Sequence, residues 1–262
     1  MRRIYPLLLL IVLPVFAAEI APQPRAHAHN DYEHARPLLD ALERGFCNVE
    51  ADIYLVEGRL LVAHDRKDVK SERTLSALYL DPLRERVRRN GGRVFPQQPS
   101  FVLLIDVKSE AAATYAALHA VLTAYADMLT SIRAGVVVPG AVTVVVSGNR
   151  AVNDIAAQSV RYAAVDGRAD DLDTNPPAAL VPWVSENWRK AFKWNWQGPI
   201  PAADRTALQS WVERAHRQGR KVRFWNTPDR PEAWTVLLEA GVDLIGTDDL
   251  AGLQRFLVER SR

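Results

Sequence analysis

The sequence has 262 residues, of which 48% are hydrophobic, so one large core can be buried whereas two independent domains would be cramped. Lysine and arginine number 33, and aspartate and glutamate number 31. Two of the arginines lie in a leader that contains no acid, so the rest of the chain is close to neutral. A near-neutral chain without Lys/Arg tracts lacks the positive charge that a nucleic-acid-binding protein needs. We expect a monomer with no nucleic-acid partner.

Residues 1–18 form the leader and have the pattern of a secretory signal peptide. Arg2 and Arg3 supply the charged start, Leu7 to Phe16 form the apolar stretch, and two alanines follow. The apolar stretch is shorter than the roughly 20 residues that span a bilayer, and it is interrupted by Pro14. We expect cleavage of the leader and export to the periplasm or the medium, with retention as a membrane anchor as the alternative.

Short apolar runs alternate with segments of helical period along residues 19–262, which is the pattern of a parallel sheet with crossover helices. In chain order, strands are predicted at Arg25–His29, Cys47–Tyr54, Phe101–Val107, Val142–Ser147, Tyr162–Val165, Leu180–Ser185, Val222–Asn226 and Val242–Gly246. Helices are predicted at Pro37–Arg44, Leu75–Arg89, Ala111–Tyr125, Arg205–Gln218, Pro231–Ala240 and Leu250–Val258. The unbroken series of units predicts an α/β fold, a (β/α)8 TIM barrel that forms a single domain.

Two further segments do not follow this alternation. Glu57-Gly58 predicts a hairpin turn that folds Leu60–His64 back on the second strand. The run from Asp170 to Pro177 is rich in aspartate and proline and predicts a loop.

Two carboxylates on the second predicted strand are the first candidates for functional residues. Glu50 and Asp52 are two residues apart, so both side chains point to one side of the strand. Both lie in an apolar run, where two adjacent ionised carboxylates are costly unless a cation neutralises them. We expect a divalent metal ion at this point, with bridging by an arginine or a lysine as the alternative.

The third predicted strand ends in a second polar pair, Asp106 and Lys108. Active sites of such barrels gather where the strands end, so Asp106 can complete an all-oxygen site of the kind that Mg²⁺ or Ca²⁺ prefers. Lys108 can bind an anionic oxygen of the substrate. The alternative is an ion pair between Asp106 and Lys108 at the end of the strand.

Two histidines follow strands that neighbour these carboxylates. His29 ends the first predicted strand, and His64 ends the segment that returns after the hairpin turn. Imidazole has a pKa of about 6.5, so one histidine can act as base and the other as acid near neutral pH. We predict that His29 and His64 form this pair, and that His34, His119 and His216 are surface or helix residues.

Together, these motifs resemble the superfamily of glycerophosphodiester phosphodiesterases, phosphatidylinositol-specific phospholipases C and spider-venom-type sphingomyelinases D. The resemblance runs from His29 to Leu250. It rests on the ordered pieces Glu50-Ala51-Asp52, Val62-Ala63-His64-Asp65, Asp106-Val107-Lys108, Phe224-Trp225-Asn226 and Gly246-Thr247-Asp248. The opening HAHNDYEHARPL and the segment RTLSALYLDPL look most like the fungal family of altered inheritance of mitochondria protein six.

The resemblance implies a metal-dependent phosphoric diester hydrolase that acts on a glycerophosphodiester, a phospholipid or a related phosphodiester. The implied site residues are His29 and His64 for catalysis, Glu50, Asp52 and Asp106 for Mg²⁺ or Ca²⁺, and Lys108 and Trp225 for the substrate. A core tryptophan is the alternative for Trp225. We expect His29 to deprotonate the attacking hydroxyl and His64 to protonate the leaving oxygen.

The sequence departs from the glycerophosphodiesterase pattern after the first histidine. Asn30-Asp31 stands in place of Arg-Gly, which removes a phosphate-binding arginine, and no Pro-Glu-Asn follows. A single helix-sized segment lies between Asp65 and Asp106, so we expect no inserted subdomain to shape a glycerol pocket. These departures leave the natural substrate open.

Three other functions stay open from the sequence. His27-Ala28-His29 also resembles a zinc-binding arrangement of amidohydrolases, although the fifth and sixth predicted strands end without histidine. A glycoside hydrolase could use Glu50 and Asp52, but both would lie on one side of the substrate. A catalytically silent barrel could bind phospholipid head groups, or contact a membrane peripherally, through the tryptophan-rich stretch Trp183 to Trp196.

Overall fold

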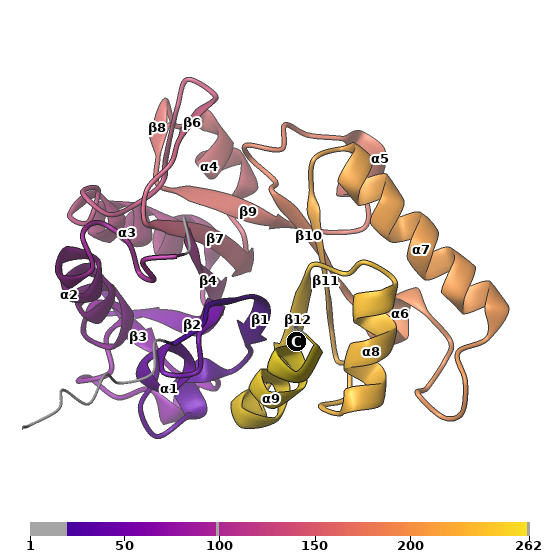
Figure 1. The fold of residues 1–262 in the computed structure, drawn as a ribbon. Coiled ribbons are helices and arrows are strands. Elements are labelled where there is room, and N and C mark those ends of the chain that lie inside the picture. The colour runs from indigo at the N-terminus through magenta and orange to yellow at the C-terminus, as the bar shows by residue number, and fades with distance from the viewer. Residues whose placement is uncertain (1–19, 98–99, 261–262) are drawn as a thin grey trace, which may run out of the picture.

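The computed structural model describes residues 20–97 and 100–260 and shows a closed barrel of parallel strands (Figure 1). The strand order is β1-β2-β4-β7-β9-β10-β11-β12, and the barrel closes because β1 pairs with both β2 and β12. The bounds are β1 Gln23–Ala28, β2 Phe46–Val56, β4 Phe101–Val107, β7 Val142–Gly148, β9 Ala163–Gly167, β10 Trp183–Asn187, β11 Lys221–Trp225 and β12 Leu244–Thr247. The predicted TIM barrel is confirmed, whereas the predicted signal peptide lies outside the described residues.

Every predicted strand overlaps one strand of the barrel, and the strand ends differ by at most three residues. The agreement has a physical basis, since strands of a parallel barrel are buried on both faces and read as continuous apolar runs. In β4, for example, Leu103, Leu104 and Ile105 are all fully buried. Polar residues within such runs are therefore exceptional, and they mark the site described below.

The hairpin after β2 also forms as predicted. Strand β3, Arg59–Val62, pairs with β2 in antiparallel fashion. The turn residues Glu57 and Gly58 both have positive φ, 50° and 77°, as a type I′ turn requires. The return strand runs away from Val56, where β2 ends, and brings His64 beside Asp52.

The helices lie around the outside of the strands (Figure 1). The predicted helices correspond to α1 Leu39–Leu42, α2 Asp81–Arg89, α3 Ala111–Thr123, α7 Ala202–Arg217, α8 Pro231–Glu239 and α9 Leu250–Arg260. A π-helical segment, Ser76–Leu80, precedes α2 and accounts for the rest of the helix predicted at Leu75–Arg89. None of the described helices is both long enough and apolar enough to cross a membrane.

Several short elements were not predicted. A separate three-stranded sheet contains β5 Ser131–Arg133, β6 Val136–Val138 and β8 Val160–Arg161. Two short helices, α4 Val152–Ala157 and α6 Trp188–Ala191, also form. The prediction of a loop at Asp170–Pro177 is wrong in part, because α5, Asp171–Thr174, makes one helical turn there.

Three of the four tryptophans in the tryptophan-rich stretch pack into the core. Trp183, Trp188 and Trp196 are only 2%, 0% and 9% exposed. The ring centroid of Trp188 lies 4.3 Å from that of Trp196 and 4.4 Å from that of Phe192. The alternative in which this stretch is the working surface is therefore wrong for these three tryptophans, because burying their rings stabilises the barrel.

Candidate active site

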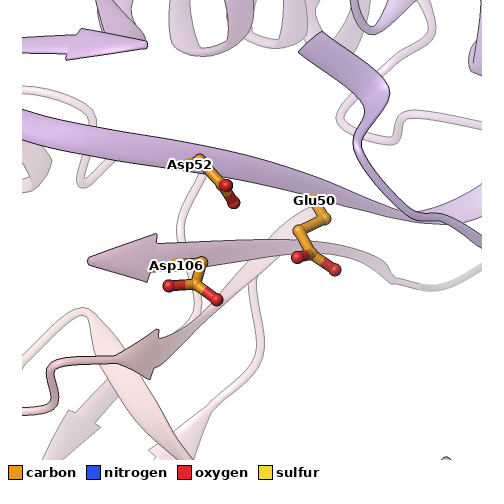
Figure 2. A group of neighbouring side chains, drawn as sticks. All are labelled: Glu50, Asp52 and Asp106. Carbon is orange, nitrogen blue, oxygen red and sulfur yellow. The ribbon is translucent and has the colours of Figure 1, made fainter. Parts of the chain in front are cut away.

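Strands β2 and β4 bring the three predicted carboxylates together near their carboxyl ends. Asp52 on β2 is the register partner of Asp106 on β4. One oxygen each of Glu50, Asp52 and Asp106 lies within 4.8 Å of the other two. Figure 2 shows the three side chains on one side of the two adjacent strands. The period of two along a strand and the parallel register together place them there.

This carboxylate cluster has the donor atoms that a divalent cation needs. All three groups offer carboxylate oxygens, which Mg²⁺ and Ca²⁺ prefer. Asp52 Oδ1 is buried and has no hydrogen-bond partner among the described residues. Leaving a buried acceptor unpaired is unfavourable, so a cation at this point would satisfy an atom that the chain itself does not. The residues therefore fit a bound metal ion.

Lys108 lies between two of the carboxylates. Its Nζ is 3.0 Å from Asp52 Oδ2 and 3.3 Å from Asp106 Oδ1, so the alternative of an ion pair at the end of β4 also forms. Burial works to lower the pKa of Lys108, but Asp52 and Asp106 outweigh it and the pKa is raised. The ammonium group therefore stays charged at the edge of the cluster.

The single positive charge of Lys108 does not neutralise the negative charge of the three carboxylates. Burial raises the pKa of Asp52 to about 6, and the charges of Glu50 and Asp106 act in the same direction against Lys108. Burial likewise raises the pKa of Asp106, where Lys108 opposes the rise and Glu50 adds to it. Burial and the neighbouring carboxylates both disfavour ionisation of these two groups, and a divalent cation would act against both effects.

Glu50 lies in a buried network of its own. Its Oε2 is 2.7 Å from the Arg223 guanidinium and 3.0 Å from His27 Nε2. Burial opposes ionisation, yet the charge of Arg223 and the hydrogen bond from His27 hold the pKa of Glu50 well below its usual range. Burial, assisted by Arg223, lowers the pKa of His27 to about 4. Neutral His27 therefore donates Nε2–H to an ionised Glu50.

His29 is held by an acid from the other end of the chain. Its Nδ1 lies 2.8 Å from Oδ1 of Asp248, which follows β12. Burial disfavours the imidazolium, but the hydrogen bond to Asp248 and the charge of Glu50 outweigh it, so the pKa of His29 is raised. Asp248 accepts a hydrogen bond from Nδ1–H, and Nε2 is left for proton transfer.

His64 is held in a similar way on the other side of the cluster. Its Nδ1 lies 2.9 Å from the Tyr32 hydroxyl and 3.2 Å from Asp52 Oδ2. The side chain of His64 is 55% exposed, whereas Asp52 is almost completely buried. The two predicted histidines thus flank the carboxylates, and each directs Nδ1 toward a carboxylate.

Most of the predicted site residues meet at one cavity of about 450 Å³. Six of the predicted site residues line it: His29, Glu50, His64, Asp106, Lys108 and Trp225. Asp52, the seventh, is bonded to Lys108 and His64. Trp225 is 43% exposed, so its ring is free to contact a ligand and is not a core residue.

The sequence analysis assigned no site role to several residues of the site, among them Tyr32, Arg168, Arg223 and Asp248. Arg168 lines the same cavity, and its guanidinium lies 2.8 Å from Asp166 Oδ2. Arg223 was detectable, because it is two residues before Trp225 and must share its side of β11. In the glycerophosphodiesterase pattern an arginine follows the first histidine, where this chain has Asn30-Asp31. Arg168 and Arg223 provide positive charge in its place.

Gly148 allows the end of β7 to approach Asp106. A Cβ atom at this position would lie 2.1 Å from Asp106 Oδ1 and 2.5 Å from a backbone oxygen. The residue also has φ +68°, which side chains other than glycine rarely adopt. Asp106 can therefore occupy its position only because residue 148 is a glycine.

The buried carboxyl group of Asp31 predicts a pH dependence of the free energy of unfolding. It is fully buried, and its Oδ2 accepts hydrogen bonds from the Leu38 backbone N–H and from the Tyr79 hydroxyl. Burial raises the pKa of Asp31 to about 7 against these two hydrogen bonds. Between about pH 4 and pH 7 the folded state keeps a proton that the unfolded state releases, so stability falls as pH rises through this window. The loss is roughly 4 kcal/mol and is constant above the window.

Asp31→Asn carries no titratable proton, so it should flatten this part of the pH dependence. Urea unfolding of both proteins at pH 5 and pH 8 measures the difference. Asp68→Asn, at an exposed position, is the control and should behave like the wild type. The same pH dependence in the wild type and Asp31→Asn would contradict the prediction.

Comparisons with known proteins agree with this geometry. A family model described as the AIM6-like phosphodiesterase domain matches residues 15–166, and the glycerophosphoryl diester phosphodiesterase family model matches residues 221–251. Altered inheritance of mitochondria protein 6 homolog of Arthroderma benhamiae is 28% identical over 261 residues, covering 88% of this chain and 82% of that protein. Altered inheritance of mitochondria protein 6 of Eremothecium gossypii is 30% identical over 268 residues, covering 88% and 69%.

Solved structures show the same fold. A glycerophosphodiester phosphodiesterase from Parabacteroides distasonis has a TM-score of 0.56 and 16% identity, covering 92% of this chain and 100% of that chain. One from Agrobacterium tumefaciens has a TM-score of 0.51 and 14% identity, covering 88% and 98%. The protein thus shares the TIM-barrel fold of these two structures. Since the first family model spans more than half of it, the chain belongs to the AIM6-like phosphodiesterase family, as the sequence motifs predicted.

Proposed function

We propose that the protein is a metal-dependent phosphoric diester hydrolase whose substrate is a glycerophosphodiester, a phospholipid or a related phosphodiester. One observation carries the proposal, namely the convergence of three carboxylates and two carboxylate-bound histidines on one cavity. The family and the fold support it, because both are shared with phosphodiesterases. We also propose that the protein acts after export, as the pattern of residues 1–18 suggests.

The charges around the cavity match a phosphodiester once a divalent cation is bound. Three fixed cations face four carboxylates, which leaves one negative charge: Lys108, Arg168 and Arg223 against Glu50, Asp52, Asp106 and Asp166. Before proton transfer the base His29 is neutral and the acid His64 is protonated, so the charge of His64 compensates that of Asp248. A divalent cation would reverse the balance to one positive charge, which is the complement of a singly charged phosphodiester.

Glu50, Asp52 and Asp106 would hold the cation, which would neutralise negative charge that grows on a non-bridging oxygen of the phosphate. Lys108 binds a second oxygen of the phosphate through its ammonium group. Arg223 keeps Glu50 ionised and fixes its position on β2. The exposed ring of Trp225 packs against the organic part of the substrate at the edge of the cavity.

The two histidines transfer the protons. His29 takes the proton of the attacking hydroxyl through Nε2, and Asp248 stabilises the imidazolium that forms. The attacking hydroxyl belongs to water or to a neighbouring group of the substrate, and attack from within the substrate gives a cyclic phosphate. His64 protonates the leaving oxygen through Nε2, while Tyr32 and Asp52 fix its Nδ1.

The contacts of His27 and His29 argue against the amidohydrolase alternative. That chemistry needs imidazole nitrogens as zinc ligands. His27 is fully buried and bonded to Glu50, and His29 is bonded to Asp248. In the part of the chain that the structure describes, the group of side chains suited to a metal ion contains carboxylates alone.

Removal of the metal tests the proposal. We expect purified protein to hydrolyse an aryl phosphodiester, to lose this activity in a chelator, and to regain it when Mg²⁺ or Ca²⁺ is added. The cation should also stabilise the fold by about 2.7 kcal/mol at a concentration 100-fold above its Kd. Glycerophosphodiesters and lysophospholipids, assayed in parallel, identify the substrate class.

Asp106→Asn is the matched variant for this experiment. It removes one carboxylate charge of the cluster and should weaken the stabilisation by the cation together with the activity. Turnover that persists unchanged in the chelator would contradict a metal-dependent mechanism. Zinc that stays bound through purification would favour the amidohydrolase instead.

A further inference from the structure

The Tyr32 hydroxyl lies at the centre of the hydrogen bonds that hold His64. It is 2.7 Å from Asp52 Oδ2, 2.7 Å from Asn30 Oδ1 and 2.9 Å from His64 Nδ1. Tyr32 is 3% exposed, and its ring is stacked on that of His64 with an interplanar angle of 17°. Tyr32 thus connects an acid–base histidine to a buried carboxylate of the metal cluster.

Proton counting fixes the direction of the bond to His64. A phenolic hydroxyl has one hydrogen, and the two oxygens beside it, on Asp52 and Asn30, can only accept. If the hydrogen went to His64 instead, both of these oxygens would face the hydroxyl oxygen at 2.7 Å with no proton between them, so the hydrogen goes to one of them and His64 Nδ1 donates to the hydroxyl oxygen. Rotating the Asn30 amide by half a turn would add a second donor and would leave His64 as a donor. The neutral form of His64 then carries its proton on Nδ1, which leaves Nε2 for the substrate.

We infer that Tyr32 is a positioning residue, which holds the ring of His64 and selects its Nδ1–H tautomer. The inference rests on the proposed function of His64 in proton transfer. His64 needs such a partner because its side chain is 55% exposed and follows the end of β3 at Val62. Holding an exposed side chain in one rotamer costs conformational entropy, which directed contacts have to compensate.

Tyr32 is itself held firmly enough to act in this way. Its backbone carbonyl accepts a hydrogen bond of 2.6 Å from the Arg73 guanidinium. The preceding residue, Asp31, is fully buried and accepts hydrogen bonds from Leu38 and Tyr79. The segment after β1 is therefore anchored at the Asp31 side chain and at the Tyr32 backbone.

Tyr32→Phe tests the inference, because it removes the hydroxyl and keeps the ring. On a diester with an alkyl leaving group, we expect kcat to fall by about 10–100-fold, since small displacements of a catalytic group have effects of this size. KM should not change when Mg²⁺ is saturating. In a His64→Ala background the same substitution should have no further effect, because Tyr32 then has no ring to position.

Tyr54→Phe is the matched control. Its hydroxyl donates to the backbone carbonyl of His64 at 3.1 Å and does not contact the imidazole ring. We expect little change in kcat for this variant. If kcat falls equally in Tyr54→Phe, the effect comes from a general loosening of the segment around His64. This result would overturn the inference.

A second readout does not depend on turnover. Nitrogen NMR of histidine-labelled protein, at a pH where His64 is neutral, reports which ring nitrogen carries the proton, and His64→Ala assigns the signal. We expect the Nδ1–H form in the wild type and an increased Nε2–H population in Tyr32→Phe. An unchanged tautomer, or a loss of kcat that persists in the His64→Ala background, would overturn the inference. Absence of diester hydrolysis in the wild type would refute the proposed function, and the NMR result would still decide the role of Tyr32.

Discussion

Replacing His64 by alanine is expected to lower kcat by about 10²–10⁴-fold on a phosphodiester with an alkyl leaving group. The alkoxide needs a proton as it leaves, and His64 is the residue that supplies it. The loss should be much smaller on an aryl phosphodiester, because a phenolate leaves without protonation. His29→Ala removes the group that activates the nucleophile, so its loss should be similar on the two substrates. Measuring kcat of both variants on both substrates gives the four values required.

His216→Ala is the control for this comparison. His216 Nε2 lies 2.8 Å from Asp243 Oδ2, the same kind of pair as His29 and Asp248. Asp243 precedes β12 whereas Asp248 follows it, so the two pairs lie at opposite ends of that strand. His216→Ala should therefore retain wild-type kcat. Near-normal turnover of alkyl diesters by His64→Ala would contradict its role. If instead the loss of kcat in His29→Ala depends on the leaving group, His29 is the acid and His64 is the base.

Most of the barrel strands were predictable from the sequence because they contain an apolar run that is followed by polar residues. β4 is the clearest case, since its bounds Phe101–Val107 agree with the prediction. The strands β5, β6 and β8 have two or three residues each, which is too short for a period to be recognised. α5 was missed for the same reason, because a single turn among aspartates reads as a loop.

The site was predictable only as far as local spacing determines it. Glu50, Asp52, Asp106 and Lys108 share a face because of the period of two along each strand. The bonds of Arg223 to Glu50 and of Asp248 to His29 join residues that are 173 and 219 positions apart. These contacts exist because the barrel closes between β12 and β1, and no local pattern specifies that closure.

Glu50→Ala is expected to destabilise the protein by about 3–5 kcal/mol even when no metal is bound. Glu50 and Arg223 are 5% and 4% exposed, and Glu50 Oε2 lies 2.7 Å from the guanidinium. Alanine would leave this guanidinium buried without a counter-ion, and Arg223 Nε already has no hydrogen-bond partner among the described residues. Urea unfolding in the presence of a chelator measures the loss. Glu72→Ala, at an exposed position, is the control and should unfold like the wild type.

Glu50→Gln separates the role of Glu50 in folding from its role in metal binding. Glutamine keeps an oxygen that can accept from Arg223 and His27, so it should retain more stability than alanine. It lacks the negative charge, so the stabilisation by Mg²⁺ or Ca²⁺ should decrease with the activity. Glu50→Ala combined with Arg223→Met removes both charges and should regain part of the stability lost in Glu50→Ala. If Glu50→Ala and Glu72→Ala unfold at the same urea concentration, the buried ion pair between Glu50 and Arg223 does not stabilise the barrel. A loss of activity in Glu50→Ala would then come from the metal site alone.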